Sequence, residues 1–175
     1  MQSLSRLSRL QDLRLKGVRA SAIPIILGFL PNLQSLDTEY NPMKSASYVV
    51  QDDMPSLRQA NSFSGRIASP ILRHVTVRTS CVGSCYFWKW ILDLLPHPGL
   101  ETFRLCAFSM NADAVIPSTF VVDLATKHRS TLKRVMVGNC HLTLADIQFL
   151  CSRAPSLEAL EFSLSSPDMV RPPLY

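Results

Sequence analysis

The sequence is poor in the features that signal catalysis, secretion or membrane insertion. It has six glycines and contains no glycine-rich phosphate loop, no His-Glu-x-x-His and no Gly-x-Ser-x-Gly. Its longest apolar run, "AIPIILGFL" at residues 22–30, is interrupted by a proline and a glycine and is about half the roughly 20 residues of a membrane span. The opening "MQSLSRLSRLQDLRLKG" has arginines among its leucines, unlike a secretory signal. We therefore expect an intracellular protein, cytoplasmic or nuclear, with no membrane partner and no cofactor.

Charge is also sparse and evenly spread. Charged residues make up 18% of the chain and hydrophobic residues 47%, which is enough apolar material for a core and excludes general disorder. The net charge of +5 contains no run of five like charges, so nothing indicates a nucleic-acid arm or a polybasic anchor. A length of 175 residues suits one domain, or part of a longer array.

Five cysteines without a secretory signal favour reduced, mostly buried thiols over a disulfide framework. Cys81 and Cys85 form one close pair, but a zinc site typically needs two such pairs, and neither His74 nor His97 has a ligand partner beside it. We interpret "CVGSC" as a loop that precedes a helix, and we expect no metal.

One phrase, apolar-x-x-apolar-x-apolar, recurs along the chain. Its copies are "LQDLRL", "LQSLDT", "LRQANS", "LRHVTV", "LETFRL", "LKRVMV" and "LEALEF", which begin at Leu10, Leu33, Leu57, Leu72, Leu100, Leu132 and Leu157. Most separations lie near the 20–29 residues of a leucine-rich repeat. The exception is the 15-residue step after Leu57, where the copy is also the poorest, with Ala60 and Ser62 at apolar positions.

Proline and helical patterns fill the intervals between the phrases. A proline two or three residues before most copies directs the chain into an extended segment, so each phrase reads as a strand. Apolar stripes at helical spacing predict helices at 86–95, 118–129 and 143–154, with Thr143 and Asp146 resembling a capping box, and weaker helices at 23–30 and 46–53. The fold class is therefore α/β: a leucine-rich-repeat solenoid of six or seven repeats, with a parallel concave sheet and outer helices.

The dipeptide Cys140-His141 suggests a nucleophile and a base. In the repeat, however, the position of Cys140 turns inward where the strand leaves for the helix, and neighbouring side chains of a strand point in different directions. We interpret Cys140 as a packing residue and Trp88 and Trp90 mainly as packing, with an exposed Trp88 as a possible interface anchor.

The segments "LPNLQSLDTEYN", "LPHPGLETFRL" and "STLKRVMVGNCHLTLADIQFLCSRAPSLEALEFS" resemble the leucine-rich-repeat region of fungal F-box-type proteins, which has a ribonuclease-inhibitor-like fold. The resemblance covers nearly the whole chain: residues 1–165 as the repeat domain and 166–175 as a proline-rich tail. It implies a substrate-recognition part of a ubiquitin-ligase subunit, in which an upstream F-box would recruit the ligase adaptor. No F-box precedes Leu10, so we expect a fragment of a longer protein or a sheet edge left open for a partner.

The leading hypothesis is a non-catalytic module that binds protein on the concave sheet. Strand alternation places a central column on that surface, made of Arg14, Asp37, Asn61, Thr76, Arg104, Met136 and Glu161. It is flanked by Asp12, His74, Arg78 and Arg134. The part from His74 to Arg134 is net basic, which suits an acidic or phosphorylated segment.

Besides protein binding, three other interpretations of the chain stay open. A nucleic-acid binder would use the arginines and tryptophans and would show steeply salt-dependent binding. A cysteine-dependent enzyme would use Cys140 or Cys81 and would contain one unusually reactive thiol. The chain is also compatible with a truncated fragment that has no function of its own.

Overall fold

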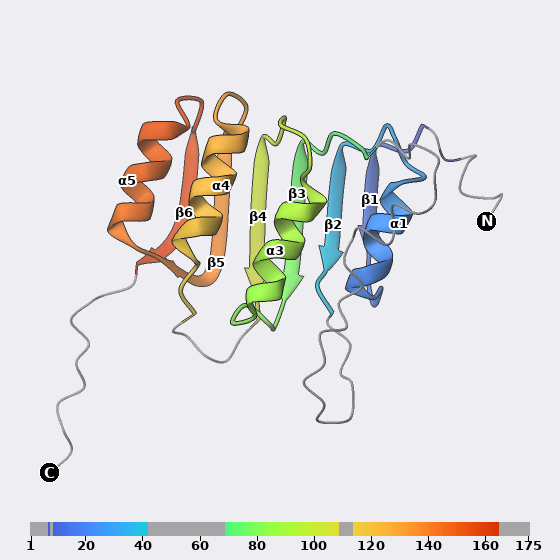
Figure 1. Ribbon diagram of the computed structural model, residues 1–175, viewed down its shortest axis with the longest axis horizontal. Helices are drawn as coiled ribbons and strands as arrows, with labels where there is room; N and C mark the ends of the chain where they lie inside the picture. The colour runs from blue at the N-terminus through green and yellow to red at the C-terminus, as the bar shows by residue number, and fades with distance from the viewer. Residues whose placement is uncertain (1–6, 8, 42–68, 109–113, 165–175) are drawn as a thin grey trace, which may run out of the picture.

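The computed structural model describes residues 7, 9–41, 69–108 and 114–164, without the side chains of 163 and 164. Six strands form one all-parallel sheet in which every strand lies beside its neighbour in the chain (Figure 1). They are β1 (Asp12–Leu15), β2 (Ser35–Glu39), β3 (His74–Thr79), β4 (Thr102–Ala107), β5 (Arg134–Leu142) and β6 (Ala159–Leu164). Each of the six begins two residues after the first leucine of a repeated phrase, which confirms the phrase as a strand signal.

The start of each strand repeats one hydrogen-bonding pattern. The Gln11 carbonyl accepts from the amides of Gln34 and Ser35, both at 2.8 Å. The carbonyls of Gln34, Arg73, Glu101 and Lys133 each accept from two successive amides of the next strand in the same way. The same residue of the phrase thus makes the same two bonds five times, which fixes a constant register at the amino ends of the strands.

The described helices all cover one face of the sheet (Figure 1). A short 3-10 turn, η2 (Ala20–Ala22), leads into α1 (Ile23–Leu27), and the longer helices are α3 (Cys85–Leu94), α4 (Ser118–His128) and α5 (Leu144–Arg153). The capping box of α5 is present: the Thr143 side chain accepts from the Asp146 amide at 3.2 Å, and the Asp146 carboxylate accepts from the Thr143 amide at 3.1 Å. None of the helices in these described ranges is long and apolar enough to cross a bilayer.

The core lies between the sheet and the helices. Along each strand, alternate side chains point into it, as a period of two requires. One row through the sheet contains Leu36, Val75, Phe103 and Val135, all at most 3% exposed. The row two residues further along the strands includes Thr38, Val77 and Leu105, which are also buried. The opposite face has no described helix over it.

A chain of aromatic contacts joins successive parts of the core. Trp90 packs on Tyr40, Tyr40 on Phe87, Phe87 on Trp88 and Trp88 on Phe120, with ring centroids 4.8–5.0 Å apart. Both indoles are buried and both donate hydrogen bonds, Trp88 to the Val82 carbonyl at 3.0 Å and Trp90 to the Ala20 carbonyl at 3.1 Å. The packing interpretation is confirmed, whereas an exposed Trp88 anchor is wrong.

The pairing of β2 and the burial of the cysteines differ from expectation. β2 is hydrogen-bonded directly to β3, with Asp37 opposite Thr76, so no strand lies between them in the sheet, and Asn61 lies outside the described residues. The phrase at Leu57, the weak helix at 46–53 and the tail at 166–175 lie outside the described residues. The expectation of mostly buried thiols is wrong: only Cys140 is buried, Cys81 and Cys106 are partly exposed, and Cys85 and Cys151 are exposed.

Candidate functional site: the open face of the sheet

The face of the sheet that no described helix covers is called the open face here. The pairing register arranges its side chains in rows across the strands. The first row is Asp12, Ser35, His74, Thr102, Arg134 and Ala159, and the second is Arg14, Asp37, Thr76, Arg104, Met136 and Glu161. Glu39, Arg78, Cys106 and Gly138 form a third. The second row is the predicted central column without Asn61, so the sequence placed its described members correctly.

On the β1–β3 side of this face the arginines are paired internally. The Asp37 carboxylate accepts two hydrogen bonds from Arg78, at 2.9 and 3.0 Å, and lies 3.3 Å from the Arg14 guanidinium. We call these three residues the Asp37 cluster. The hydrogen bonds from Arg78, reinforced by the charges of Arg78 and Arg14, lower the pKa of Asp37 although partial burial opposes this. Nearby, Glu39 accepts from the Gly17 amide at 3.1 Å.

The β3–β5 side is different. His74, Thr102 and Arg134 are adjacent in the first row, and Thr76, Arg104 and Met136 are adjacent in the second. We call these six residues the basic array. Arg104 and Arg134 are exposed, and neither guanidinium has an ion pair or hydrogen bond with any residue in the described ranges. The array contains no carboxylate, so its two guanidinium groups are available to an external anion.

The nine predicted binding positions thus fall into two groups plus one outlier. Arg14 and Arg78 both bind Asp37, whereas His74, Thr76, Arg104, Arg134 and Met136 come together in the basic array. Glu161 is exposed on β6, opposite Met136, and borders the array. Sequence reasoning missed Thr102 and Cys106, although the alternation that selected His74 and Arg134 also puts these two on the open face.

The end of β5 explains the conspicuous Cys140-His141 dipeptide. Asn139 has a positive φ of 58°, and its side-chain amide donates to the Ala107 carbonyl at 2.9 Å. The pairing with β6 shifts register between Met136 and His141, so the strand bulges at this point. Cys140 points into the core with no exposure, and burial raises the pKa of its thiol to about 11. A protonated, enclosed thiol does not act as a nucleophile at neutral pH.

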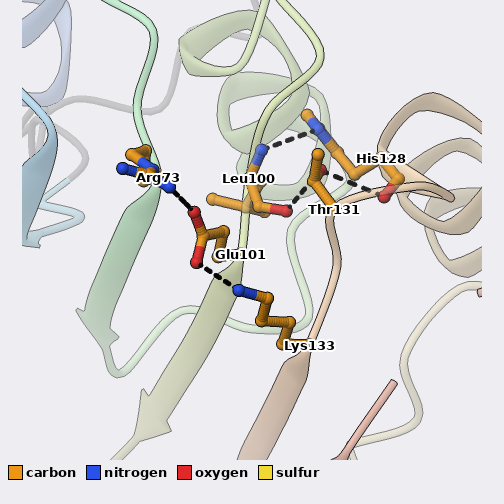
Figure 2. Close-up of polar contacts among 6 residues, drawn as sticks. All are labelled: Arg73, Leu100, Glu101, His128, Thr131 and Lys133. Carbon is orange, nitrogen blue, oxygen red and sulfur yellow. Dashed lines mark hydrogen bonds and ion pairs between the residues drawn. The ribbon is translucent and has the colours of Figure 1, made fainter. Parts of the chain in front are cut away.

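A second polar region lies at the amino ends of the strands (Figure 2). Glu101 accepts from Arg73 at 2.6 Å and from Lys133 at 3.1 Å, so one carboxylate joins the residues that precede β3, β4 and β5. These partners, Lys133 first, lower the pKa of Glu101. Glu101 and Arg73 border an open hollow of about 870 Å³. Because Arg73 and Lys133 are already paired with Glu101, this region offers less to an external anion than the basic array.

His128 is the buried titratable group beside this region. Its side chain is enclosed between α4 and the start of β4, and its Nδ1 accepts from the Leu100 amide at 3.3 Å (Figure 2). Nε2 has no partner among the described residues. Burial is the main reason that the pKa of His128 falls to about 4, so the imidazole is neutral at physiological pH. We interpret it as a structural support for the entry to β4.

Neither the grouping of possible metal ligands nor the comparison with known proteins assigns a function. Within the described ranges no three His, Cys, Asp or Glu side chains are grouped to hold a metal ion. Comparison of the whole chain with known protein families, characterised proteins and solved structures finds no match. The function therefore has to be argued from the open face itself.

Proposed function

We propose that this protein is a non-catalytic binding module that holds a protein partner on the open face of its sheet. The observation that carries the proposal is the pair Arg104 and Arg134, exposed on adjacent strands without an acidic partner among the described residues. Unpaired arginines on a rigid sheet attract a carboxylate or phosphate more strongly than arginines that are already neutralised. The preferred partner segment is acidic or phosphorylated.

The same proposal includes a leucine-rich-repeat solenoid as the architecture. Support comes from the constant two-residue offset between phrase and strand and from the five identical carbonyl patterns at the strand starts. Such solenoids bind partners on the face opposite their helices. From the resemblance to fungal F-box-type proteins we propose substrate recognition within an intracellular ubiquitin-ligase subunit, with the ligase adaptor bound by an F-box elsewhere in a longer protein.

Nucleic-acid binding is the second candidate because the chain is basic. Two observations weigh against it. Trp88 and Trp90, the aromatic residues that would stack on bases, are buried and hydrogen-bonded in the core. Asp37 and Glu161 border the basic array on both sides, which interrupts the continuous positive stripe that a polyanion backbone prefers.

A capture experiment with matched variants tests the proposal. The native chain, Arg104→Glu/Arg134→Glu and Lys89→Glu/Arg129→Glu would each be used as bait in lysate of the source cells, with quantitative mass spectrometry. The control pair makes the same charge change at exposed positions outside the sheet, on α3 and at the end of α4. We expect one defined protein to be retained by the native chain and the control but lost from the array variant. Equal retention by all three baits would refute the open face as the binding surface.

A further inference from the structure

The two edges of the sheet are complementary to each other in backbone groups, apolar side chains and charge. β1 and β6 form these edges, and no described strand pairs with the outer side of either one (Figure 1). We infer, independently of the proposed function, that the β6 edge of one copy of this chain binds the β1 edge of a second copy. The parallel sheet would then continue from one copy into the next, because an unpaired strand edge is a template for another strand.

The backbone at the two edges has matching hydrogen-bonding groups. Inside the sheet, the carbonyl of the residue before each of the first five strands accepts from two successive amides of the next strand. The Lys133 carbonyl accepts in this way from the amides of Glu158 and Ala159, at 2.7 and 3.1 Å. The Glu158 carbonyl has the same place in the pattern at β6, and no described amide donates to it. The amides of Gln11 and Asp12 are the two donors that this pattern directs away from β2, toward the outer edge of β1.

The apolar side chains at the two edges are matched in the same register. The row of the sheet that begins at Leu13 ends at Leu160. A second copy added beyond β6 in this register places its Leu13 beside Leu160 and its Leu15 beside Phe162. The inner members of the Leu13 row are at most 3% exposed, whereas these four edge side chains are only partly buried. Pairing of the two edges would therefore remove apolar surface from water and join the cores of the two copies.

Charge favours this head-to-tail pairing over a symmetric one. In the same register Arg14 of the second copy lies beside Glu161, and opposite charges on neighbouring strands attract. Glu161 is exposed, and the Arg14 side chain is 57% exposed despite its contact with Asp37. A symmetric contact between two β6 edges would instead bring Glu158 and Glu161 against the carboxylates of the other copy. One between two β1 edges would bring Arg14 and Lys16 against like charges.

The pairing is heterologous, because it joins two different edges and leaves one of each free on the resulting dimer. A third copy can therefore add to either end, and association continues unless the assembly closes into a ring. The mass of the assembly is consequently expected to depend on the concentration of the chain.

Sedimentation velocity of the full chain over a concentration series measures this association. We expect the weight-average mass of the native chain to rise with concentration. Glu161→Arg and Arg14→Glu each place like charges at the junction and should weaken association about tenfold, whereas the double variant exchanges the two charges and should restore it. Lys89→Glu on α3 is the control, for which we expect no effect. Thermal melting confirms that each variant is folded.

A cross-linking experiment locates the junction without a change at Arg14. Copies with Asp12→Cys and copies with Ala159→Cys would be mixed, mildly oxidised and analysed by mass spectrometry. Neighbouring strands lie about 4.8 Å apart, which is within the range of Cα separations that a disulfide spans. We expect a disulfide between positions 12 and 159, in clear excess over links through Cys85 and Cys151. Those two thiols are exposed on α3 and α5 and report random collisions.

The outcomes distinguish head-to-tail pairing from its alternatives. A chain that stays monomeric at every concentration would overturn the inference, as would links between positions 12 and 159 that are no more frequent than those through the native thiols. Weakening by Glu161→Arg without weakening by Arg14→Glu would indicate symmetric β6 pairing, and the reverse would indicate symmetric β1 pairing. Either result contradicts the inference. The proposed function is tested separately, through the dependence of partner capture on Arg104 and Arg134.

Discussion

The Asp37 cluster and the basic array are built alike but differ in whether their arginines are paired. Each presents two arginines from neighbouring parts of the same sheet face. In the cluster, one carboxylate binds Arg14 and Arg78, whereas Arg104 and Arg134 form no ion pair among the described residues. A single aspartate thus engages both arginines of the cluster, whereas the arginines of the array stay available to an external anion. The comparison shows that the availability of a charge, rather than the number of charges, decides where a partner binds.

The largest effect is expected when the two arginines of the basic array are replaced, in comparison with the two arginines of the Asp37 cluster. Arg104→Ala/Arg134→Ala should weaken binding of the captured partner by about 4 kcal/mol, roughly a thousandfold, because two charge-assisted contacts are lost. Arg14→Ala/Arg78→Ala should leave that affinity within about twofold and instead reduce the free energy of unfolding by about 1 kcal/mol. Titration calorimetry and urea unfolding give the two values. Equal losses of affinity would contradict the distinction between the two regions.

The pH dependence of the free energy of unfolding tests whether His128 supports the entry to β4. Burial holds the folded-state pKa of His128 at about 4, below its ordinary value of 6.5. As the pH falls below 6.5 the unfolded chain takes up a proton that the folded chain does not, so the free energy of unfolding decreases until about pH 4, by about 3 kcal/mol in total. Urea unfolding of the native chain and of His128→Gln isolates this contribution. We expect the difference between them to be larger at pH 7 than at pH 4.5, and a constant difference would contradict the role of His128.

The interior beneath the Asp37 cluster contains a polar group of a different kind. Thr38 in β2 is fully buried, and its hydroxyl has no hydrogen-bond partner among the described residues. Thr38→Val keeps the shape and removes this unpaired group, so the free energy of unfolding should rise by about 1 kcal/mol. Val77→Thr in the neighbouring strand is the matched opposite change and should lower it by a similar amount or more. A loss of stability in Thr38→Val would mean that the hydroxyl has a partner.

The smallest effect is expected from a substitution that makes the Asp37 cluster resemble the basic array. Asp37→Asn removes the carboxylate and leaves Arg14 and Arg78 unpaired on the open face. Affinity for the captured partner should rise only about two- to threefold, because the released arginines lie beside the array instead of within it. Binding of oligo-dT should become more dependent on salt. Unchanged affinity for both probes would show that the Asp37 cluster does not restrict binding.

The strands and the open-face rows could be predicted from the sequence, because the phrase fixes both where a strand begins and which side chains point outward. The pairing within the Asp37 cluster could not. A strand at Leu57, as the phrase suggested, would have separated Asp37 from Arg78 by roughly 10 Å, or two strand spacings. The direct pairing of β2 with β3 brings Arg78 next to Asp37, so the two side chains form an ion pair. The resulting contrast therefore depends on a long-range contact that local patterns do not encode.

The position of the partner can be measured directly with the chain's own thiols. Cys106 is partly exposed on the open face, two residues after Arg104 in β4, whereas Cys85 and Cys151 are exposed on α3 and α5. We would measure the alkylation rate of each cysteine by mass spectrometry, with and without saturating partner. The account predicts that the partner slows alkylation of Cys106 and leaves Cys85 and Cys151 unchanged. Protection of Cys85 or Cys151 with Cys106 unaffected would place the partner on the helical side and contradict it.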